Sequence, residues 1–187
     1  MAIYTIEEQV FVYRKEQLEQ WKSGNKFLIP HFIESHKDYQ TQPNYHFGEI
    51  FVIDTYNRLH GWKGFRFYAL GNWELENIKY KLSREKISQL IPEERLSEFR
   101  EVRKEEDEMS GVGEPDVMLY NDNGQILFLE VKKENDKISN DQLKCLAQIK
   151  SILKAEIGIV YLREENQKYS PQKYALDLNN YCGELLS

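Results

Sequence analysis

The sequence contains few cysteines, no long apolar run and no excess of positive charge. Its two cysteines, Cys145 and Cys182, are too few for a disulfide framework and lack the spacing of metal ligands. No apolar stretch is long enough for a membrane-spanning helix, and residues 1–8 have neither the basic region nor the continuous apolar region of a signal peptide. These features argue against a disulfide-rich secreted scaffold and a helical membrane protein, so we expect a cytoplasmic protein.

The charge balance limits how the chain can bind nucleic acid. The formal net charge is −6, with 25 basic and 31 acidic residues. Domains that coat nucleic acid by bulk electrostatics are usually strongly basic, which argues against that class, although a local basic groove can coexist with acidic helices elsewhere. With 187 residues and 41% hydrophobic composition, the chain can bury one ordinary core, and we predict a single domain.

The most informative stretch, residues 113–132, is predicted to form a β-hairpin. Two runs rich in β-forming residues, 117–120 and 126–132, flank a polar turn with an Asn-Gly pair, whose positive φ angles suit a tight hairpin. In an antiparallel pair the residues nearest the open end lie opposite each other, so Asp116 and Glu130 should converge. Lys132 lies two residues after Glu130 and should point to the same face.

These residue types suit the chemistry of a hard divalent cation. Mg²⁺ prefers oxygen ligands and keeps several waters, so the carboxylates of Asp116 and Glu130 and the carbonyl of Val131 would leave room for a phosphate and an attacking water. Lys132 could orient or deprotonate that water, or stabilise charge on the phosphate oxygens. A Glu-x-Lys pattern without further context is more often a solvated pair on an edge strand.

The context is a resemblance that runs over about residues 111–162. The pattern G-x-P-D, then E-V-K, then N/G-D-x-L-S-x-x-Q is typical of the VRR-NUC family of the PD-(D/E)XK nuclease superfamily, which includes the nuclease domain of the Fanconi-associated nuclease and small stand-alone bacterial and phage proteins. This chain resembles it closely, with Ile138 where the family usually has Leu and Cys145 where Trp is common. The matching positions are Gly113, Pro115, Asp116, Glu130, Val131, Lys132, Asn135, Asp136, Ser139 and Gln142.

The resemblance implies an α/β fold with an αβββαβ core, in which helices flank a mixed sheet. It also implies a DNA nuclease that depends on Mg²⁺ or Mn²⁺ and hydrolyses phosphodiester bonds, with Asp116, Glu130 and Val131 at the metal and Lys132 at the water. Gln142 would steady the water or a phosphate; alternatively, it is only the N3 partner of Ser139 in a helix-capping box.

Glu49 is a third candidate metal ligand. It lies near the start of an apolar helix predicted over residues 45–60, where burying a carboxylate is costly unless a cation or hydrogen bonds compensate for it. The stretch from His46 to Glu49 resembles a His-Gly-Glu stretch of the superfamily, with Phe47 as an insertion, and this implies a metal ligand. The alternative is a partly solvated Glu favoured by the helix macrodipole.

The remaining elements are predicted from capping and periodicity. A Thr5-x-x-Glu8 capping box predicts a helix to about Lys22, and residues 61–73 read as a strand or a loop. We expect a helical extension over 1–44, a nuclease core over 45–165 and a tail over 166–187 that ends in a short helix. Further helices are predicted over 74–90, 92–108 and 139–154, and a strand over 156–162 completes a right-handed parallel crossover.

Three basic residues are candidates for nucleic-acid contacts. Lys63 and Arg66 lie beside aromatic residues and could contact phosphates or bases, although a solvated rim over an apolar patch is the more common explanation of such residues. Lys133 follows the Glu-x-Lys motif and is expected to contact the nucleic acid.

The expected partner is DNA, with a branched or single-strand-containing substrate, and the resemblance implies a homodimer that is cytoplasmic and nucleoid-associated. Two alternatives stay open. One is a restriction or defence nuclease, and the other is a catalytically silent module that binds DNA or protein. The motif does not separate these, because loops and partners that spacing does not encode decide target choice.

Overall fold

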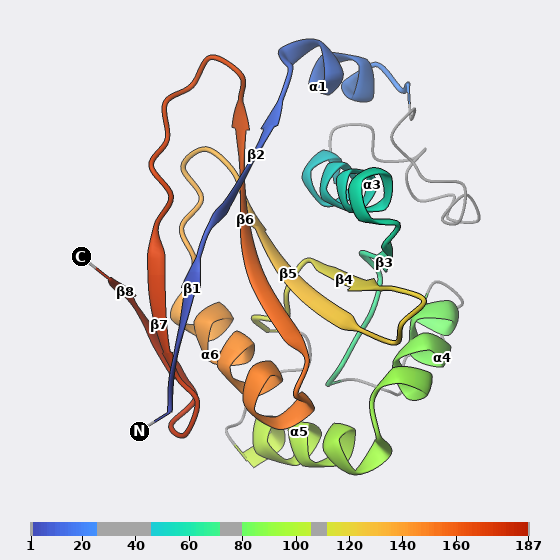
Figure 1. Ribbon diagram of the computed structural model, residues 1–187, viewed down its shortest axis with the longest axis vertical. Coiled ribbons are helices and arrows are strands. Elements are labelled where there is room, and N and C mark those ends of the chain that lie inside the picture. The colour runs from blue at the N-terminus through green and yellow to red at the C-terminus, as the bar shows by residue number, and fades with distance from the viewer. Residues whose placement is uncertain (1, 26–45, 72–79, 106–111, 187) are drawn as a thin grey trace.

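A five-stranded mixed sheet forms the centre of the computed structural model, which describes residues 2–25, 46–71, 80–105 and 112–186 (Figure 1). The strand order is β2-β6-β5-β4-β3, in which β3, β4 and β5 are antiparallel neighbours while β6 runs parallel to both β5 and β2. The strands are β2 (Gln9–Tyr13), β3 (Lys63–Phe65), β4 (Val117–Tyr120), β5 (Ile126–Lys132) and β6 (Glu156–Glu164).

The predicted hairpin is present as β4 and β5. Val117 lies opposite Leu129, so Asp116 and Glu130 follow at the open end. The turn differs in detail from the prediction, because Gly124 has a positive φ of 77° and Asn123 does not. Instead, the side chain of Asn121 accepts hydrogen bonds from the backbone N–H groups of Asn123 and Gln125. The turn is therefore a three-residue loop that closes on one left-handed glycine.

The predicted crossover from β5 to β6 is also present. It contains α6 (Asn140–Gln148) and a π-helical segment, η3 (Ile149–Leu153), which ends at Lys154 in the left-handed region. The predicted capping box at Ser139 and Gln142 starts α6 with both of its hydrogen bonds. The helix thus begins where the sequence predicts, and its last turn widens to π geometry.

Alternate residues of the central strands pack into two apolar clusters. The α3 (Phe47–His60) helix, which confirms the helix predicted over 45–60, covers the face that carries Val117, Leu129 and Val160. The opposite face, with Met118, Phe128, Ile159 and others, packs against α5 and α6 (Figure 1). The period of two in side-chain direction therefore fixes which residues of β4 and β5 face α3.

Two further helices, α4 (Lys81–Leu90) and α5 (Glu93–Glu105), follow β3. They confirm the helices predicted before and after Ile91-Pro92, while residues 74–79, 106–108 and the whole segment 26–44 lie outside the described residues. Residues 61–73, predicted to be a strand or a loop, contain the short strand β3 near their start. No helix in the described ranges is long and apolar enough to cross a membrane.

The helix predicted from Thr5 is wrong over its first half. Residues Ile3–Glu7 form β1 and residues Gln9–Tyr13 form β2, and only then does α1 (Lys15–Lys22) begin. Glu8, predicted to close a capping box, is 5% exposed and accepts hydrogen bonds from the hydroxyl groups of Tyr169 and Tyr174. Sheet partners distant in sequence therefore override the local helix signal.

The short helix predicted in the tail is wrong as well. β7 (Lys173–Asp177) and β8 (Cys182–Leu186) form a hairpin, and β1 completes a three-stranded antiparallel sheet in the order β1-β7-β8. Tyr174 and Leu176 alternate on the buried side of β7, a strand pattern that was too short to distinguish from a helix turn. The boundaries at 44 and 165 stay predictions, but the described part of the extension contributes β2 to the central sheet.

Candidate active site

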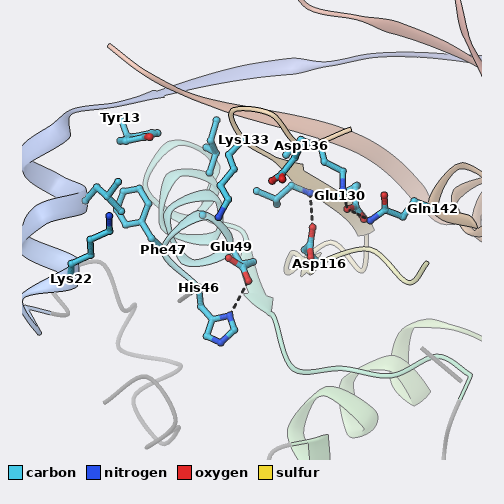
Figure 2. Close-up of a pocket in the computed structure, with 15 residues that line it drawn as sticks. Tyr13, Lys22, His46, Phe47, Glu49, Asp116, Glu130, Lys133, Asp136 and Gln142 are labelled. Carbon is cyan, nitrogen blue, oxygen red and sulfur yellow. Dashed lines mark hydrogen bonds and ion pairs between the residues drawn. The ribbon is translucent and has the colours of Figure 1, made fainter. Parts of the chain in front are cut away.

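A pocket of about 520 Å³ lies at the open end of the β4–β5 hairpin (Figure 2). The start of α3, the ends of β2 and α1, and the loop before α6 form its other walls. It brings together all the predicted metal and catalytic residues and one predicted nucleic-acid contact, namely Glu49, Asp116, Glu130, Val131, Lys132, Gln142 and Lys133.

The loop before β4 positions Asp116. Gly113 has a φ of 69°, and a Cβ atom there would lie 2.5 Å from the backbone oxygen of Asp141 in α6. Only glycine lets the loop approach the helix so closely. The buried hydroxyl of Tyr68 donates a hydrogen bond of 2.5 Å to the carbonyl of Pro115, the residue before Asp116. Two contacts, at Gly113 and at Pro115, therefore fix the loop that leads into Asp116.

The carboxyl groups of the half-buried Asp116 and the buried Glu130 lie next to each other. Asp116 Oδ2 accepts a hydrogen bond of 2.9 Å from the backbone N–H of Val131. Burial raises the pKa of Asp116; the Val131 hydrogen bond opposes this shift and the nearby Glu49 carboxylate adds to it. Burial and then the Asp116 carboxylate raise the pKa of Glu130 well above its usual value, against the opposing effect of Lys132. Two crowded carboxylates in this environment favour a cation between them.

Two side chains contact the carboxylate of Glu130, which is 1% exposed. Lys132 Nζ lies 2.8 Å from Glu130 Oε1, and Gln142 Nε2 donates a hydrogen bond of 2.6 Å to the same oxygen. Gln142 Oε1 also accepts from the N–H of Ser139, so both interpretations of Gln142 apply: it caps α6 and it contacts the site. Glu130 Oε2 is buried and has no hydrogen-bond partner among the described residues.

Glu49 lies in the first turn of α3, with its side chain 23% exposed. Its Oε1 is 3.0 Å from His46 Nδ1. Burial alone would raise the pKa of Glu49, but the hydrogen bonds from His46 and from its own backbone N–H, together with the charge of Arg66, lower it overall. Glu49 therefore stays ionised beside Asp116, which suits a cation ligand as well as a partly solvated residue at a helix N-terminus.

The oxygen donors of the pocket fit a divalent cation in part. Within the described ranges, no three His, Cys, Asp or Glu side chains already form a group that could hold a metal ion. However, Glu130 Oε2 is a buried oxygen without a partner, and two adjacent carboxyl groups have raised pKa values. Two carboxylates and a backbone carbonyl fit a hard cation that keeps much of its water.

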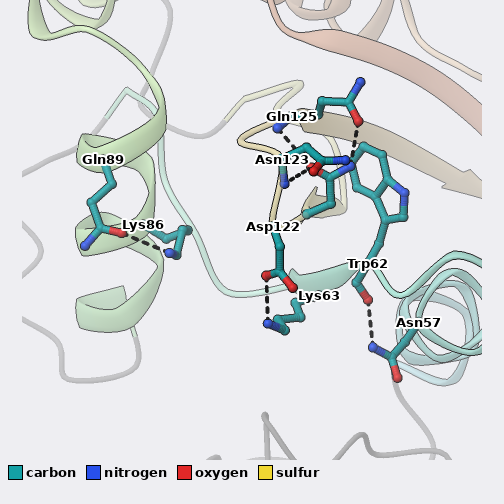
Figure 3. A network of polar contacts seen from close by, with 9 residues as sticks. Asn57, Trp62, Lys63, Lys86, Gln89, Asp122, Asn123 and Gln125 are labelled. Atoms are coloured by element: carbon teal, nitrogen blue, oxygen red, sulfur yellow. Dashed lines mark hydrogen bonds and ion pairs between the residues drawn. The ribbon is translucent and has the colours of Figure 1, made fainter.

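The three predicted nucleic-acid contacts lie in different places. Lys133 is exposed and lines the pocket. Arg66 Nη2 lies 2.6 Å from His46 Nδ1, at the edge of the pocket beside Glu49. Lys63 lies at the opposite end of the hairpin, where its ammonium group is 3.0 Å from Asp122 Oδ1 (Figure 3). The structure therefore does not bring Lys63 to the pocket.

Sequence reasoning missed one wall of the pocket. It is formed by Tyr13, Leu18 and Lys22 of the N-terminal segment, with Phe47 of α3 and Leu162 of β6. The alternating Val10 to Tyr13 run, which is rich in β-branched and aromatic residues, could have indicated a strand before α1. The helix predicted from Thr5 hid this signal.

The comparisons with known proteins agree with the motifs. The model of the VRR-NUC domain matches residues 54–158, more than half of the 187 residues. No curated protein matches the chain. The chain is similar to a crystal structure of paFAN1 bound to 2-nt 5′-flap DNA with a gap, with 21% identity, a TM-score of 0.40 and coverage of 52% of this chain and 17% of that chain. From the extent of the domain match, the chain belongs to the VRR-NUC domain family.

Proposed function

We propose that this protein is a divalent-metal-dependent DNA nuclease that hydrolyses phosphodiester bonds. The observation that carries the proposal is the adjacent pair of Asp116 and Glu130 in a pocket of a VRR-NUC chain, with Lys132 and Gln142 both in contact with Glu130. The order α3, β3, β4, β5, α6, β6, with α4 and α5 inserted after β3, supports the αβββαβ core of the PD-(D/E)XK superfamily.

Asp116, Glu130 and the Val131 carbonyl would hold Mg²⁺ or Mn²⁺, and Glu49 would add a direct or water-mediated ligand. When bound, the cation supplies Lewis-acid stabilisation of the charge that develops on the phosphate oxygens. Gln142 fixes the orientation of the Glu130 carboxylate, because its amide is tied to both Glu130 and the helix cap. A carboxylate held in this way needs no rearrangement when the substrate binds.

Lys132 is the residue best placed to act on the attacking water. Its side chain is buried and its ammonium group lies within the pocket, 2.8 Å from Glu130. From there it can orient a water molecule toward phosphorus or balance negative charge on the phosphate. The joint presence of Asp116, Glu130 and Lys132 in one pocket favours an enzyme over a silent binding module.

The test is incubation with a panel of single-stranded, duplex, flap, splayed and four-way-junction DNAs, and matching RNAs, with Mg²⁺, Mn²⁺ or EDTA. We expect cleavage of DNA with either metal and none in EDTA. Cleavage of one member only would define the substrate class, including a structure-specific repair enzyme. Cleavage confined to one duplex sequence would favour the restriction or defence alternative, and binding without cleavage would favour the silent module.

Glu49 and the homodimer need separate tests. A crystal soaked with Mn²⁺ is expected to show the Glu49 carboxylate within direct or one-water reach of the ion held by Asp116 and Glu130. A Glu49→Gln variant with full activity would remove Glu49 from the site.

A twofold dimer would place two such pockets on two DNA strands, and light scattering at micromolar concentration decides whether it forms.

A further inference from the structure

The pocket has two chemically different halves (Figure 2). The carboxylate half contains Asp116, Glu130 and Gln142. The second half, which we call the aromatic half, contains Tyr13 from the end of β2, Lys22 from the end of α1 and Phe47 from the start of α3. The side chain of Lys133 lies between the two halves, and its ammonium group points into the pocket. A cation and one phosphate would occupy the carboxylate half alone.

The aromatic half is built to present a ring. The Tyr13 and Phe47 rings meet edge to face, with centroids 5.3 Å apart and an interplanar angle of 73°. Phe47 is 7% exposed, whereas Tyr13 is only half-buried and lines the pocket. Phe47 therefore supports the Tyr13 ring from the core side and limits its rotation. A fixed aromatic ring at a pocket wall is the usual platform for a nucleic-acid base.

Two lysines bring positive charge to the pocket, while the carboxylates of Glu134 and Glu164 lie near the Tyr13 hydroxyl. Lys22 and Lys133 are both exposed side chains that line the pocket, one in each wall. A lysine pair that flanks an aromatic ring suits a phosphate on each side of a stacked base. The pocket volume of about 520 Å³ lies within the range of about 300–1,000 Å³ for small-ligand sites, so it has room beyond a cation and a phosphate.

We propose that the aromatic half binds the base of an unpaired nucleotide next to the scissile phosphate, with Tyr13 as the stacking platform and Lys22 and Lys133 as phosphate contacts. The inference rests on the proposed function, because it takes the carboxylate half as the site of cleavage. A base stacked in a duplex does not reach into such a pocket, so the substrate must offer an unpaired or extruded nucleotide at the cut.

The three side chains that define this half lie outside the range matched by the family domain. Tyr13, Lys22 and Phe47 all lie outside residues 54–158, the range that the family domain covers. The carboxylates Asp116 and Glu130 lie inside that range. In this proposal, residues before the matched range, Tyr13, Lys22 and Phe47, add a nucleotide contact to the carboxylates Asp116 and Glu130 within it.

The experiment is an abasic scan on a single-stranded DNA that the full chain cleaves at one site. Each base near the cut is replaced in turn by an abasic residue, and kcat/KM is measured with Mg²⁺. Removal of the base at one position next to the cut should lower kcat/KM roughly 5- to 150-fold, the change that corresponds to base–aromatic stacking. Tyr13→Ala should remove this position dependence and Tyr13→Phe should keep it. Tyr13→Leu, which preserves apolar packing, should behave like Tyr13→Ala at an unchanged melting temperature.

A second readout does not need cleavage. 2-Aminopurine is placed at each position of the single strand in turn, and its fluorescence is followed on binding in Ca²⁺. Wild type and Tyr13→Phe should quench the base, whereas Tyr13→Leu should not. Lys22→Ala should weaken binding several-fold, while Lys15→Ala, on the exposed start of the same α1 helix and not at the pocket, should not.

The outcomes separate this inference from the proposed function. If the chain cleaves DNA but the abasic scan is flat, or Tyr13→Leu keeps the wild-type pattern, the nucleotide site is wrong and the nuclease stands. If the chain cleaves nothing, the nuclease fails, and the fluorescence scan alone decides the nucleotide site. Quenching that depends on Tyr13 supports it, and quenching at no position overturns it.

Discussion

The two ends of the β4–β5 hairpin carry the same kinds of charged residue in opposite environments. At the turn end, Asp122 has a side chain that is 84% exposed and pairs with Lys63 (Figure 3). At the open end, Glu130 is 1% exposed and pairs with Lys132. The hairpin needs the turn to form, whereas its fold does not need carboxylates at the open end.

The contrast between the two ends shows that the open end carries residues placed at a cost to stability. An exposed pair such as Lys63–Asp122 is screened by water and adds little to stability. At the open end, burial raises the pKa of Glu130 and Asp116 and one Glu130 oxygen has no hydrogen-bond partner in the described part of the chain. Violations of this kind are expected where function, rather than stability, selects the residues. Four experiments test that contrast.

The largest effect is expected from neutralising the open-end carboxylates. Asp116→Asn and Glu130→Gln should each lower the cleavage rate by roughly 10³-fold or more, because several kcal/mol of charge stabilisation depend on a cation held there. The measurement is single-turnover cleavage with Mg²⁺ and Mn²⁺. Asp122→Asn makes the same chemical change at the turn end and should cleave at the wild-type rate. Equal rates for Asp116→Asn and Asp122→Asn would refute the site.

The next effect concerns the buried lysine. Lys132→Met should lower kcat by roughly 10²–10⁴-fold, the range for a positioned proton-transfer or electrostatic group, with DNA affinity little changed. Lys150 is a matched control, since its ammonium group also lies 2.8 Å from a glutamate, Glu156, whose side chain is 59% exposed. Lys150→Met should be fully active. Parallel loss of binding and turnover in Lys132→Met would make Lys132 a phosphate clamp instead.

A smaller effect should separate the two roles of Gln142. Gln142→Ala removes both its hydrogen bond to Glu130 and its part in the α6 cap, and should lower kcat about 10- to 100-fold, as expected for a hydrogen bond to a charged group. Ser139→Ala removes only the cap and should cost about 0.5–2 kcal/mol of unfolding free energy with near-normal kcat. Chemical denaturation and steady-state kinetics give both values. Equal kcat values in the two variants would show that Gln142 acts only in the helix cap and not on Glu130.

The smallest effect is on stability against pH in the absence of divalent cations. A carboxyl group whose folded pKa is raised stabilises the fold below its unfolded pKa of about 4.3, and this contribution is lost as pH rises through the folded pKa. As pH rises from about 4.3 through the folded pKa of Glu130, the melting temperature of wild type in EDTA should therefore fall more steeply than that of Glu130→Gln. Asp122→Asn should keep the wild-type slope. An unchanged slope in Glu130→Gln would show that Glu130 is not strained by burial.

Local signals in the sequence were sufficient for the open end of the hairpin. The turn residues, the alternation in β4 and β5 and the capping box at Ser139 all act over a few residues, and together they place Asp116, Glu130 and Gln142 near one another. Which oxygen of Glu130 would lack a partner depends on packing from several elements, and spacing does not encode that.

The N-terminal segment could not be predicted in the same way. The Thr5-x-x-Glu8 pattern fits a helix cap, but Glu8 finds its partners in Tyr169 and Tyr174, more than 160 positions later. Pairing of β1 with β7 and of β2 with β6 is decided by tertiary contacts, which local propensity does not report. The error placed Tyr13 on a helix instead of at the end of β2, so the aromatic half of the pocket was missed.

The long-range pairing of β1 and β2 has a consequence during synthesis of the chain. Val10 pairs with Tyr161 and Ile6 with Tyr174, so these strands wait for residues that the ribosome adds much later. At about 5–20 residues per second, the delay is roughly 8–30 seconds, during which two apolar strands have no sheet partner and are open to chaperones or aggregation. The nascent chain can therefore close its β4–β5 hairpin before β2 pairs with β6 and brings Tyr13 to the pocket, so the aromatic half of the pocket forms last.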